Sequence, residues 1–592
     1  MSSTVSASWP APRTRRLSRA KVGLAIGLVA FGISWQVIGV NLSSIFSLQA
    51  AADAWKFLSG LFPPDFSPEF LSIVLKASGQ TLATAIASTV LSIVLGVPLA
   101  VLASATLWRR GILVEGVKRS AGAAVIFTAS RLARAALGFI RAVPDILWAI
   151  LFVTMVGLGP LAGTLALAVA YSGLIGQVYS DVFDASDMQP LEALQSTGAT
   201  RLQIFLRGML PQSWPALTAY SLYSFECCVR AASVLGLVGA GGIGYEIGIS
   251  MRLFEYGQVL TLILAFIALM ALTDGVSRLI RWRITRRAGK KLQQSGAPDA
   301  VSAAISQPSP PRMGYWGRFL VPIAILIGLS AAFYFSGFTP GILDQENLVR
   351  HAVRFISGMV PPNAQPTFVY KMGYLVLQTF AISFIGTLIG VFFGALLALP
   401  ATASLAFLNV DTTGCHGIIE RSVRFLTYWS ARLVLNVLRA IPELVWVLVC
   451  ILVIGIGPFA GAIAIGLHTA GVLGKLYAEV MEEVPRAPVE ALYAVGARPF
   501  QVLFYAVWPQ AKPMLFNYTL LRWEANLRVS TILGLVGGGG LGQAIYNSIQ
   551  LGFYQDVATM ILLVYALVLA TSWAGDRIRG FNQASELVYL ET

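Results

Sequence analysis

Two halves of the chain carry the same motifs in the same order, at a constant offset of 298 positions. The recurring motifs include RAVPD at 141–145 and RAIPE at 439–443, EALQSTGA at 192–199 and EALYAVGA at 490–497, and LGLVGAGGIG at 235–244 and LGLVGGGGLG at 533–542. No gap is needed to keep these landmarks in register. Self-similarity at a fixed period is the signature of a repeated structural unit. The sequence therefore predicts two copies of one module.

Each copy consists mainly of apolar runs long enough to cross a bilayer. Hydrophobic residues make up 56% of the chain and charged residues only 12%, about half the charged fraction of a soluble domain. Apolar runs of about 20 residues span the hydrocarbon core as helices. We predict spans near 22–40, 72–103, 143–159, 161–183, 213–240 and 257–280, and near 319–338, 374–403, 441–457, 459–479, 511–538 and 555–576. The expected fold is an all-α polytopic membrane protein with two tandem six-helix copies and about 12 transmembrane helices.

The distribution of Lys and Arg predicts the orientation of these spans. Basic residues gather in 13–21, 109–134 and 281–291, whereas 41–71 has only Lys56. Cytoplasmic loops carry the excess of Lys and Arg, so we expect a multi-pass membrane protein with both termini in the cytoplasm. An even number of spans per copy gives the copies the same orientation. The net charge of +14 then reflects membrane loops, and we expect no nucleic-acid partner.

The predicted organisation has four parts. They are a cytoplasmic basic tail (1–21), a first copy of six spans (22–282), a cytoplasmic linker (283–317) and a second copy of six spans (318–592). The linker is basic and then rich in Ser, Ala, Gln and Pro, which is typical of a flexible connection. Arg131 and Arg134 have helical spacing within 120–140, which favours an amphipathic helix at the membrane interface; a short extra span is the alternative.

A repeated motif on the predicted cytoplasmic side carries the strongest functional signal. It reads Glu-Ala, then Gly-Ala, then Pro (Pro211 and Pro509), which predicts a short helix, a glycine turn and a second short helix before the fifth span. Such an elbow is suited to docking into a groove of a partner, and an ordinary helical hairpin is the alternative. Its occurrence in both copies favours docking. The expected docking residues are Glu192, Ala193, Gly198, Ala199, Glu490, Ala491, Gly496 and Ala497.

Charged residues inside the predicted spans are candidates for the transport pathway, because ionisable groups in a membrane are costly. Glu226 and Arg230 in the fifth span recur as Glu524 and Arg528. They form either self-neutralised pairs at i,i+4 or groups that face a central pathway, and their repetition favours the pathway. His468 and Lys475 share one face of the fourth span in the second copy, where a buried, hydrogen-bonded His is the alternative. The glycine runs 239–244 and 537–542 offer N–H groups for an anion or a tight extracellular turn.

The sequence gives little indication of metal binding, catalysis or ATP hydrolysis. Three histidines and four cysteines lack metal or redox spacing, so we expect no metal and no catalytic residues. No G-x4-GK[ST] segment is present, and without that phosphate-binding loop the chain is not expected to hydrolyse ATP.

The repeated Glu-Ala/Gly-Ala elbow resembles the EAA loop, a motif that marks the permease subunits of bacterial ABC importers. Further motifs resemble the phosphonate branch: they lie at Arg439–Trp446, Gly455–Gly461, 468–475, 523–528 and 533–542. The resemblance covers nearly all of both copies but not the tail or the linker. The family usually has one copy per chain and works as a dimer, so this chain resembles a fused dimer. The first copy departs from the pattern, with Ala170 at the position of His468 and Gln177 at that of Lys475.

The resemblance implies a type I ABC importer permease for phosphonate or a related oxyanion such as phosphite or phosphate. Two copies of a cytoplasmic ABC ATPase subunit would bind the elbows and hold the ATP, so no cofactor belongs to this chain. A periplasmic or lipid-anchored phosphonate-binding protein would deliver the substrate, and membrane lipid would surround the spans. The alternative is a secondary active transporter with two parallel six-span halves, although WRRGILVEGVKR, between the second and third spans, lacks that class's charged signature.

Overall fold

The computed structural model describes residues 14–40, 47–108, 121–294, 326–338, 346–403, 418–534 and 537–590, and no β-strand occurs among them. The first copy contains α1 (Thr14–Ile38), α3 (Leu48–Gly60), α4 (Pro68–Ala103), α6 (Ala121–Ala142), α7 (Asp145–Val156), α8 (Pro160–Asp184), α11 (Leu210–Leu235), α12 (Gly242–Arg252) and α13 (Tyr256–Gln294). The second contains α16 (Glu346–Gly358), α17 (Pro366–Ala401), α19 (Ile418–Ala440), α20 (Glu443–Ile454), α21 (Pro458–Glu483), α24 (Trp508–Leu533), α25 (Leu541–Gln550) and α26 (Tyr554–Leu590).

Long apolar helices confirm the predicted all-α polytopic membrane fold. Within the described ranges, seven helices are long and apolar enough to cross a membrane, or nine if each of two bent pairs is one span. Two further predicted spans correspond to the shorter apolar helices Ala25–Ile38 and Leu326–Phe335. Helix α24 occupies the place of the fifth span in the second copy, but its Lys, Arg and Glu residues make it more polar than α11. The described helices therefore give fewer clear spans than the predicted twelve.

The third predicted span of each copy is wrong as a straight helix. The apolar run near 143–159 forms the 12-residue helix α7, which joins α6 at a bend of 89°. The equivalent pair α19 and α20 bends by 95°. A 12-residue helix rises about 18 Å, too short for the bilayer core of about 30 Å. Pro144 and Pro442 stand at the bends, and a residue before proline avoids the helical conformation. The amphipathic segment 120–140 is therefore one arm of a broken helix.

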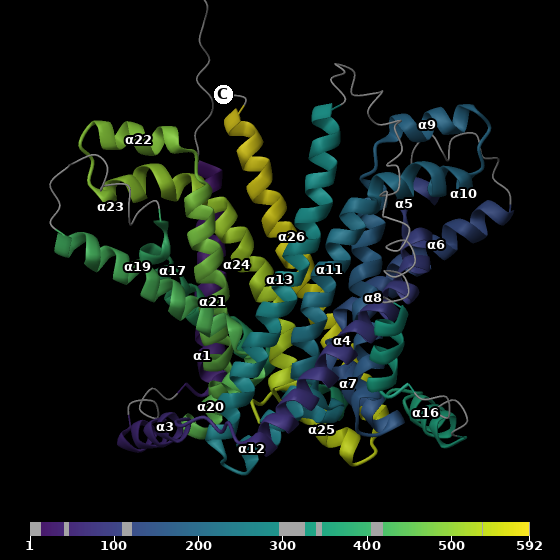
Figure 1. Ribbon diagram of the computed structural model, residues 1–592, viewed down its shortest axis with the longest axis horizontal. Coiled ribbons are helices and arrows are strands. Elements are labelled where there is room, and N and C mark those ends of the chain that lie inside the picture. The colour runs from purple at the N-terminus through teal and green to yellow at the C-terminus, as the bar shows by residue number, and fades with distance from the viewer. Residues whose placement is uncertain are drawn as a thin grey trace, which may run out of the picture.

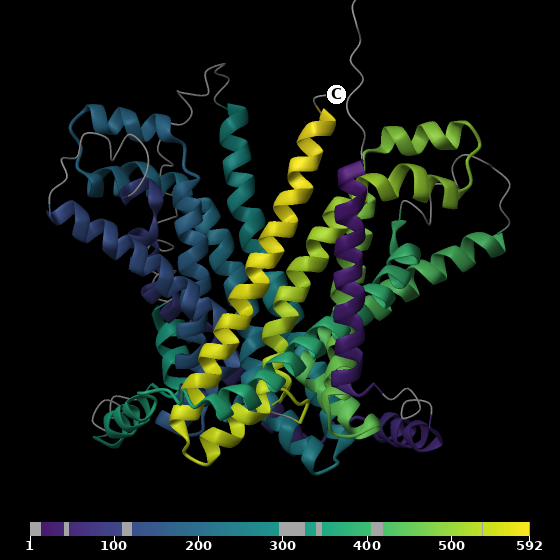
Figure 2. The ribbon, with the colours of Figure 1, turned by 180° about the vertical axis from the view of Figure 1, so that it is seen from behind.

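The two copies interlock rather than merely adjoin. Helix α1 packs on α17, α7 packs on α16, and α20 packs on α3, so elements of one copy cover the other. One buried core combines Leu147 and Ile150 of α7 with Ile545 and Val564 of the second copy. The internal symmetry and these cross-packed cores show that the fused copies form a single interleaved bundle (Figure 2).

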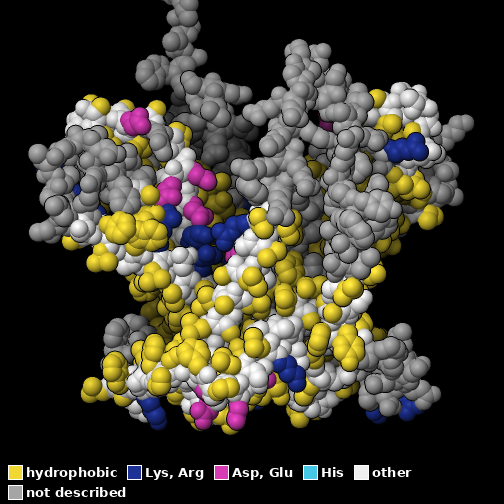
Figure 3. Space-filling view, viewed as in Figure 1, with side chains coloured by type: hydrophobic (Ala, Val, Ile, Leu, Met, Phe, Trp, Pro, Cys, Tyr) yellow, Lys and Arg dark blue, Asp and Glu magenta, His cyan; other side chains and the backbone are white. Residues whose placement is uncertain are grey.

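Both copies point the same way, as predicted. The segments α9 (Met188–Ser196) and α22 (Arg486–Ala494), which contain the repeated elbow motif, lie on one face together with the C-terminal ends of α13 and α26 (Figure 1). Helices α3, α12, α16 and α25 lie on the opposite face. Hydrophobic side chains cover most of the surface between these two faces (Figure 3), as a lipid-exposed surface requires. Most of the predicted linker, and residues 1–13 of the tail, lie outside the described residues.

Candidate functional site

The repeated elbow has the helix–glycine–helix geometry predicted from its sequence. In the first copy, Asp187 caps α9 by accepting a hydrogen bond from the N–H of Gln189 (3.1 Å). Gly198 then has φ of 81° and Gly496 has φ of 80°, a left-handed conformation that residues with a Cβ avoid. The chain therefore reverses at each glycine. One detail differs from prediction: the second short helix continues through a π-helical turn into the fifth span, without a break at Pro211.

The elbows present their motif residues outward. Glu490 and the alanines Ala193 and Ala491 are exposed, as are both glycines. The remaining motif residues, Glu192, Ala199 and Ala497, are half-buried. The inner side of the first elbow is held by Leu191, which is fully buried against Phe205 and Met209. Burial raises the pKa of the Tyr493 hydroxyl in α22, so this side chain stays neutral at physiological pH. Each elbow is thus a supported hairpin with an accessible polar rim.

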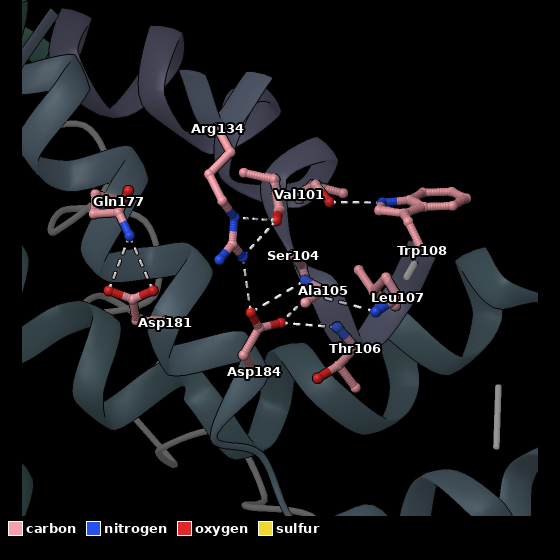
Figure 4. Close-up of polar contacts among 11 residues, drawn as sticks. Val101, Ser104, Ala105, Thr106, Leu107, Trp108, Arg134, Gln177, Asp181 and Asp184 are labelled. Carbon is pink, nitrogen blue, oxygen red and sulfur yellow. Dashed lines mark hydrogen bonds and ion pairs between the residues drawn. The ribbon is translucent and has the colours of Figure 1, made fainter. Parts of the chain in front are cut away.

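A carboxylate junction ties the elbow of the first copy to the neighbouring helices (Figure 4). Asp184, the last residue of α8, receives hydrogen bonds from the segment after α4 and from α6. Its partners are the Ser104 hydroxyl (2.7 Å), the N–H groups of Ala105 (3.1 Å) and Thr106 (2.9 Å), and Arg134 Nη2 (3.1 Å). Arg134 also donates to the Ala103 carbonyl (2.8 Å). Three helices therefore meet at one carboxylate directly before the elbow.

The second copy repeats this junction with a longer carboxylate. Glu482 Oε1 accepts from the N–H of Ala403 (2.6 Å) and pairs with Arg432 Nη2 (2.6 Å). Arg432 donates to the carbonyl of Ala401 (3.0 Å). Because Arg134 and Arg432 belong to the outer arms of the two broken helices, each junction links an elbow to the arm that leads to the molecular centre.

We expect Asp184→Ala to destabilise the first copy. The substitution leaves Arg134 and two backbone N–H groups without their partner, and the cost is about 2 kcal/mol for such a half-exposed cluster. The thermal unfolding temperature of the detergent-solubilised chain should fall. Asp181→Ala is the matched control, because Asp181 is an exposed residue of the same helix whose side chain accepts a hydrogen bond from Gln177 (3.1 Å) one turn away. Equal unfolding temperatures for the two variants would contradict the anchoring role.

A cavity of about 180 Å³ lies between the copies, at the inner ends of the broken helices. Asp145 and Glu443, the first residues of α7 and α20, reach it from opposite copies. Its other lining residues are Tyr171, Cys227, Arg230, Ala231, Val234, Leu444, Val529 and Ile532. The cavity thus combines apolar walls with ionisable groups at the symmetry-related centre of the molecule, the usual composition of a small-molecule site.

Arginines of both copies lie in and near this cavity. Arg230 lines it, and Arg522 pairs with the lining residue Glu443. Arg230 also lies close enough to Arg439, and Arg528 to Arg141 and Asp145, for their charges to interact. Figure 3 shows Lys and Arg side chains gathered beside α24, next to a group of Asp and Glu side chains. Guanidinium groups in a partly enclosed space attract an anion.

The carboxylate of Glu443 is neutralised within its own copy. His468 Nε2 lies 3.1 Å from Glu443 Oε1, and Arg522 Nη2 lies 3.2 Å from the same oxygen. The other ring nitrogen of His468, Nδ1, is 3.0 Å from the carbonyl of Ile441. Both ring nitrogens thus lie within hydrogen-bonding distance of oxygen atoms. His468 is 2% exposed, so it takes the buried, hydrogen-bonded position that the sequence left as the alternative.

The glutamates of the fifth spans form their ion pairs with another helix and not with the arginine four residues further on. Glu226 Oε1 is 2.7 Å from Arg281 Nη2 of α13, and Glu524 Oε1 is 2.9 Å from Arg579 Nη1 of α26. Each pair joins the fifth helix to the last helix of its copy. Arg230 is left exposed to the cavity. In the predicted group of four, each glutamate therefore pairs with the last helix of its copy, and Arg230 lines the cavity.

Lys475 does not share the surroundings of His468. It pairs with Glu479 (3.5 Å) one turn further along α21 and lines a small, separate pocket with Arg432 and Asn436. Two helical turns carry it away from the cavity toward the elbow end of α21.

The glycine runs after the fifth spans are satisfied by the protein itself. The N–H of Ile243 donates to Thr81 Oγ1 (2.9 Å), and the N–H of Leu541 donates to Thr379 Oγ1 (2.9 Å). Gln378 accepts a further hydrogen bond from Gly540 (2.8 Å). These contacts explain the repeated Gln-Thr pairs and support the turn interpretation, on the face opposite the elbows.

Sequence reasoning missed Asp145 and Glu443 as cavity residues and Arg522 as the ion-pair partner of Glu443. The first two belong to the repeated RAVPD and RAIPE motifs, which were interpreted only as the entrance of the third span. The pattern that could have revealed them is a carboxylate directly after a proline inside an apolar segment. Arg522 has no counterpart in the first copy, where Ser224 occupies the position, so repetition could not reveal it. Within the described ranges, no group of three metal-ligating side chains is present.

Comparison with known proteins places this arrangement in a family. Residues 121–286 and 415–580 each match the family described as "Binding-protein-dependent transport system inner membrane component". The chain belongs to this family. The two matches together cover more than half of the chain, one in each copy, and each includes the broken helix, the elbow and the cavity residues of its copy. The chain is therefore a permease component of an ABC transport system with two permease domains fused, and ATP hydrolysis belongs to a separate subunit.

Two relatives illustrate the resemblance. The chain is 32% identical over 450 residues to the "Phosphate-import permease protein PhnE" of Mycolicibacterium smegmatis, covering 75% of this chain and 77% of the relative. It is 35% identical over 262 residues to the "Phosphite transport system permease protein PtxC" of Stutzerimonas stutzeri, covering 43% of this chain and 86% of the relative. Among solved structures, the inward-facing MetNI methionine ABC transporter matches 37% of this chain and 99% of its own at 26% identity, with a TM-score of 0.31.

Proposed function

We propose that this chain forms the pathway by which phosphonate or a related phosphorus oxyanion crosses the bacterial inner membrane. The observation that carries the proposal is the cavity between the copies, which Arg230 lines and near which further arginines of both copies lie. Such a site favours a small anion over a neutral or cationic solute. The names of the relatives, which specify phosphate and phosphite, agree with this chemistry.

The elbows are the proposed docking sites for two copies of a cytoplasmic ABC ATPase subunit. Both elbows lie on one face, carry an exposed rim and are supported from inside by buried apolar residues. We assign this face, with the C-terminal ends of α13 and α26, to the cytoplasm. Rigid attachment at Asp184 and Glu482 supports transmission of a movement of the ATPase to the broken helices, and thus to the cavity.

The opposite face is the proposed docking surface for the substrate-binding protein. It is formed by α3, α12, α16 and α25, and the family description names dependence on a binding protein. The glycine turns on this side are held by internal hydrogen bonds, so they contribute a fixed surface. The binding protein is expected to select phosphonate or a related oxyanion and release it toward the cavity.

Uptake by reconstituted vesicles tests the substrate class. Vesicles that contain this chain, its co-purified ATPase and its binding protein should accumulate labelled phosphate, phosphite or methylphosphonate when ATP is supplied to the ATPase side. An unlabelled phosphorus oxyanion should compete, and methionine should not. Competition by amino acids in place of oxyanions would reject the proposed substrate class.

A further inference from the structure

The two carboxylates of the central cavity differ in what surrounds them. Glu443 is held by His468 and Arg522 through one of its oxygens. Asp145 accepts a hydrogen bond from the N–H of Ile146 at the start of its own helix (3.0 Å), and no ion pair involves it in the part of the chain that the structure describes. One oxygen of Asp145 is therefore available to accept a hydrogen bond within the cavity.

This asymmetry follows from residues that differ between the two copies. The position equivalent to His468 in the first copy is Ala170, and the position equivalent to Arg522 is Ser224. Neither small side chain can neutralise Asp145. The copies therefore provide the same carboxylate position twice, but only the second copy provides side chains that pair with it.

A cation lies on the same cavity wall as the free carboxylate. Arg230 lines the cavity with an exposed side chain, and no ion pair of Arg230 occurs within the described ranges. Tyr171, another lining residue, lies within electrostatic range of both Arg230 and Asp145. The cavity thus offers a guanidinium donor, Arg230, and a carboxylate acceptor without an ion pair, Asp145. This combination fits an anion that also carries an O–H donor.

We propose that Asp145 accepts a hydrogen bond from the acidic O–H of the transported oxyanion, and thereby selects protonated phosphorus oxyanions against sulfate. The inference rests on the proposed function, because it takes this cavity as the oxyanion pathway. Below their second pKa, phosphate, phosphite and alkylphosphonates keep a proton on oxygen, whereas sulfate has none. A carboxylate that faces sulfate stays unpaired and repels it, and a site built around a substrate O–H strongly rejects an analogue without one.

Cys227 provides a probe that needs neither transport nor partner proteins. It lines the same cavity, whereas Cys228 and Cys450 are buried. In the solubilised full chain with Cys415→Ser, alkylation by N-ethylmaleimide should modify Cys227, and Cys227→Ser should abolish the signal. At about pH 8, where more of the thiol is ionised and phosphate still carries one O–H, phosphate should slow this alkylation. Sulfate should need a concentration at least about tenfold higher for the same protection.

Variants of Asp145 test the assignment. Asp145→Asn removes the charge and adds an N–H donor, so protection by sulfate should rise to within about threefold of that by phosphate. Asp145→Glu keeps an acceptor and should keep the preference, as should Asp181→Asn, which removes an exposed carboxylate of α8 outside the cavity. Equal protection by sulfate and phosphate in the unmodified protein, or an unchanged preference in Asp145→Asn, would overturn the inference.

The outcomes separate this inference from the proposed function. Absence of protection by either anion would reject the role of Asp145, while ATP-driven uptake of phosphorus oxyanions would still support the proposed function. Failure of uptake with selective protection intact would reject the proposed transport activity and leave the selectivity of the cavity standing.

Discussion

Replacing Glu192 and Glu490 by alanine together should release the ATPase subunit from the permease. The two glutamates lie on the rims of the two elbows, where Glu490 is exposed and Glu192 half-buried. Removing one member of a charged pair at an interface costs about 2 kcal/mol or more, which corresponds to roughly 30-fold in affinity at each elbow. The measurement is the amount of ATPase that co-purifies with the tagged permease in detergent.

The control for this double variant is Glu69→Ala with Glu255→Ala. Both are exposed glutamates, and they precede or begin helices on the face opposite the elbows. This variant should retain the ATPase at the level of the unmodified chain. If the elbow variant co-purifies with as much ATPase as the control variant, the docking assignment of the elbows is wrong.

Replacing Arg230 or Arg528 by alanine should lower uptake about tenfold or more without loss of assembly. Arg230 lines the central cavity, and Arg528 lies within electrostatic range of Asp145 there. A hydrogen bond from a charged group contributes about 1.5–3 kcal/mol, and its loss leaves the anion less well stabilised in the pathway. Initial rates of ATP-driven uptake in vesicles measure the effect, with co-purified ATPase as the test of assembly.

Arg278→Ala is the matched control for the pathway arginines. Arg278 is an exposed arginine of α13 that is not among the residues lining the cavity. Its removal changes the net charge by the same amount but does not touch the cavity. Uptake at the unmodified rate by Arg230→Ala and Arg528→Ala would return both residues to a structural role.

The repeat explains why the sequence predicted so much of the fold. Each copy must satisfy the same contacts, so the elbow glycines and the common direction of the copies follow from local sequence alone. Gly198 and Gly496 illustrate this, because the turn they form is determined within a few residues. Hydropathy could not locate the bends at Pro144 and Pro442, since an apolar run has the same composition whether it is straight or broken.

The candidate site was harder to predict because its contacts join distant segments. Glu226 was compared with Arg230 on the same helix, but its partner Arg281 lies on the last helix of the copy, 55 positions away. The pairing of His468 with Glu443 likewise depends on the packing of α20 against α21. Local spacing can identify which charged residues lie within the spans, but only the tertiary packing decides which of them pair and which face the cavity.

The most direct test of the account is the energy source of uptake. Vesicles that contain this chain alone and are given a proton or sodium gradient should not accumulate phosphorus oxyanions, whereas vesicles that also contain the ATPase and the binding protein should do so only with ATP. Gradient-driven uptake by the chain alone would contradict a permease worked by a separate ATPase and would favour a secondary transporter.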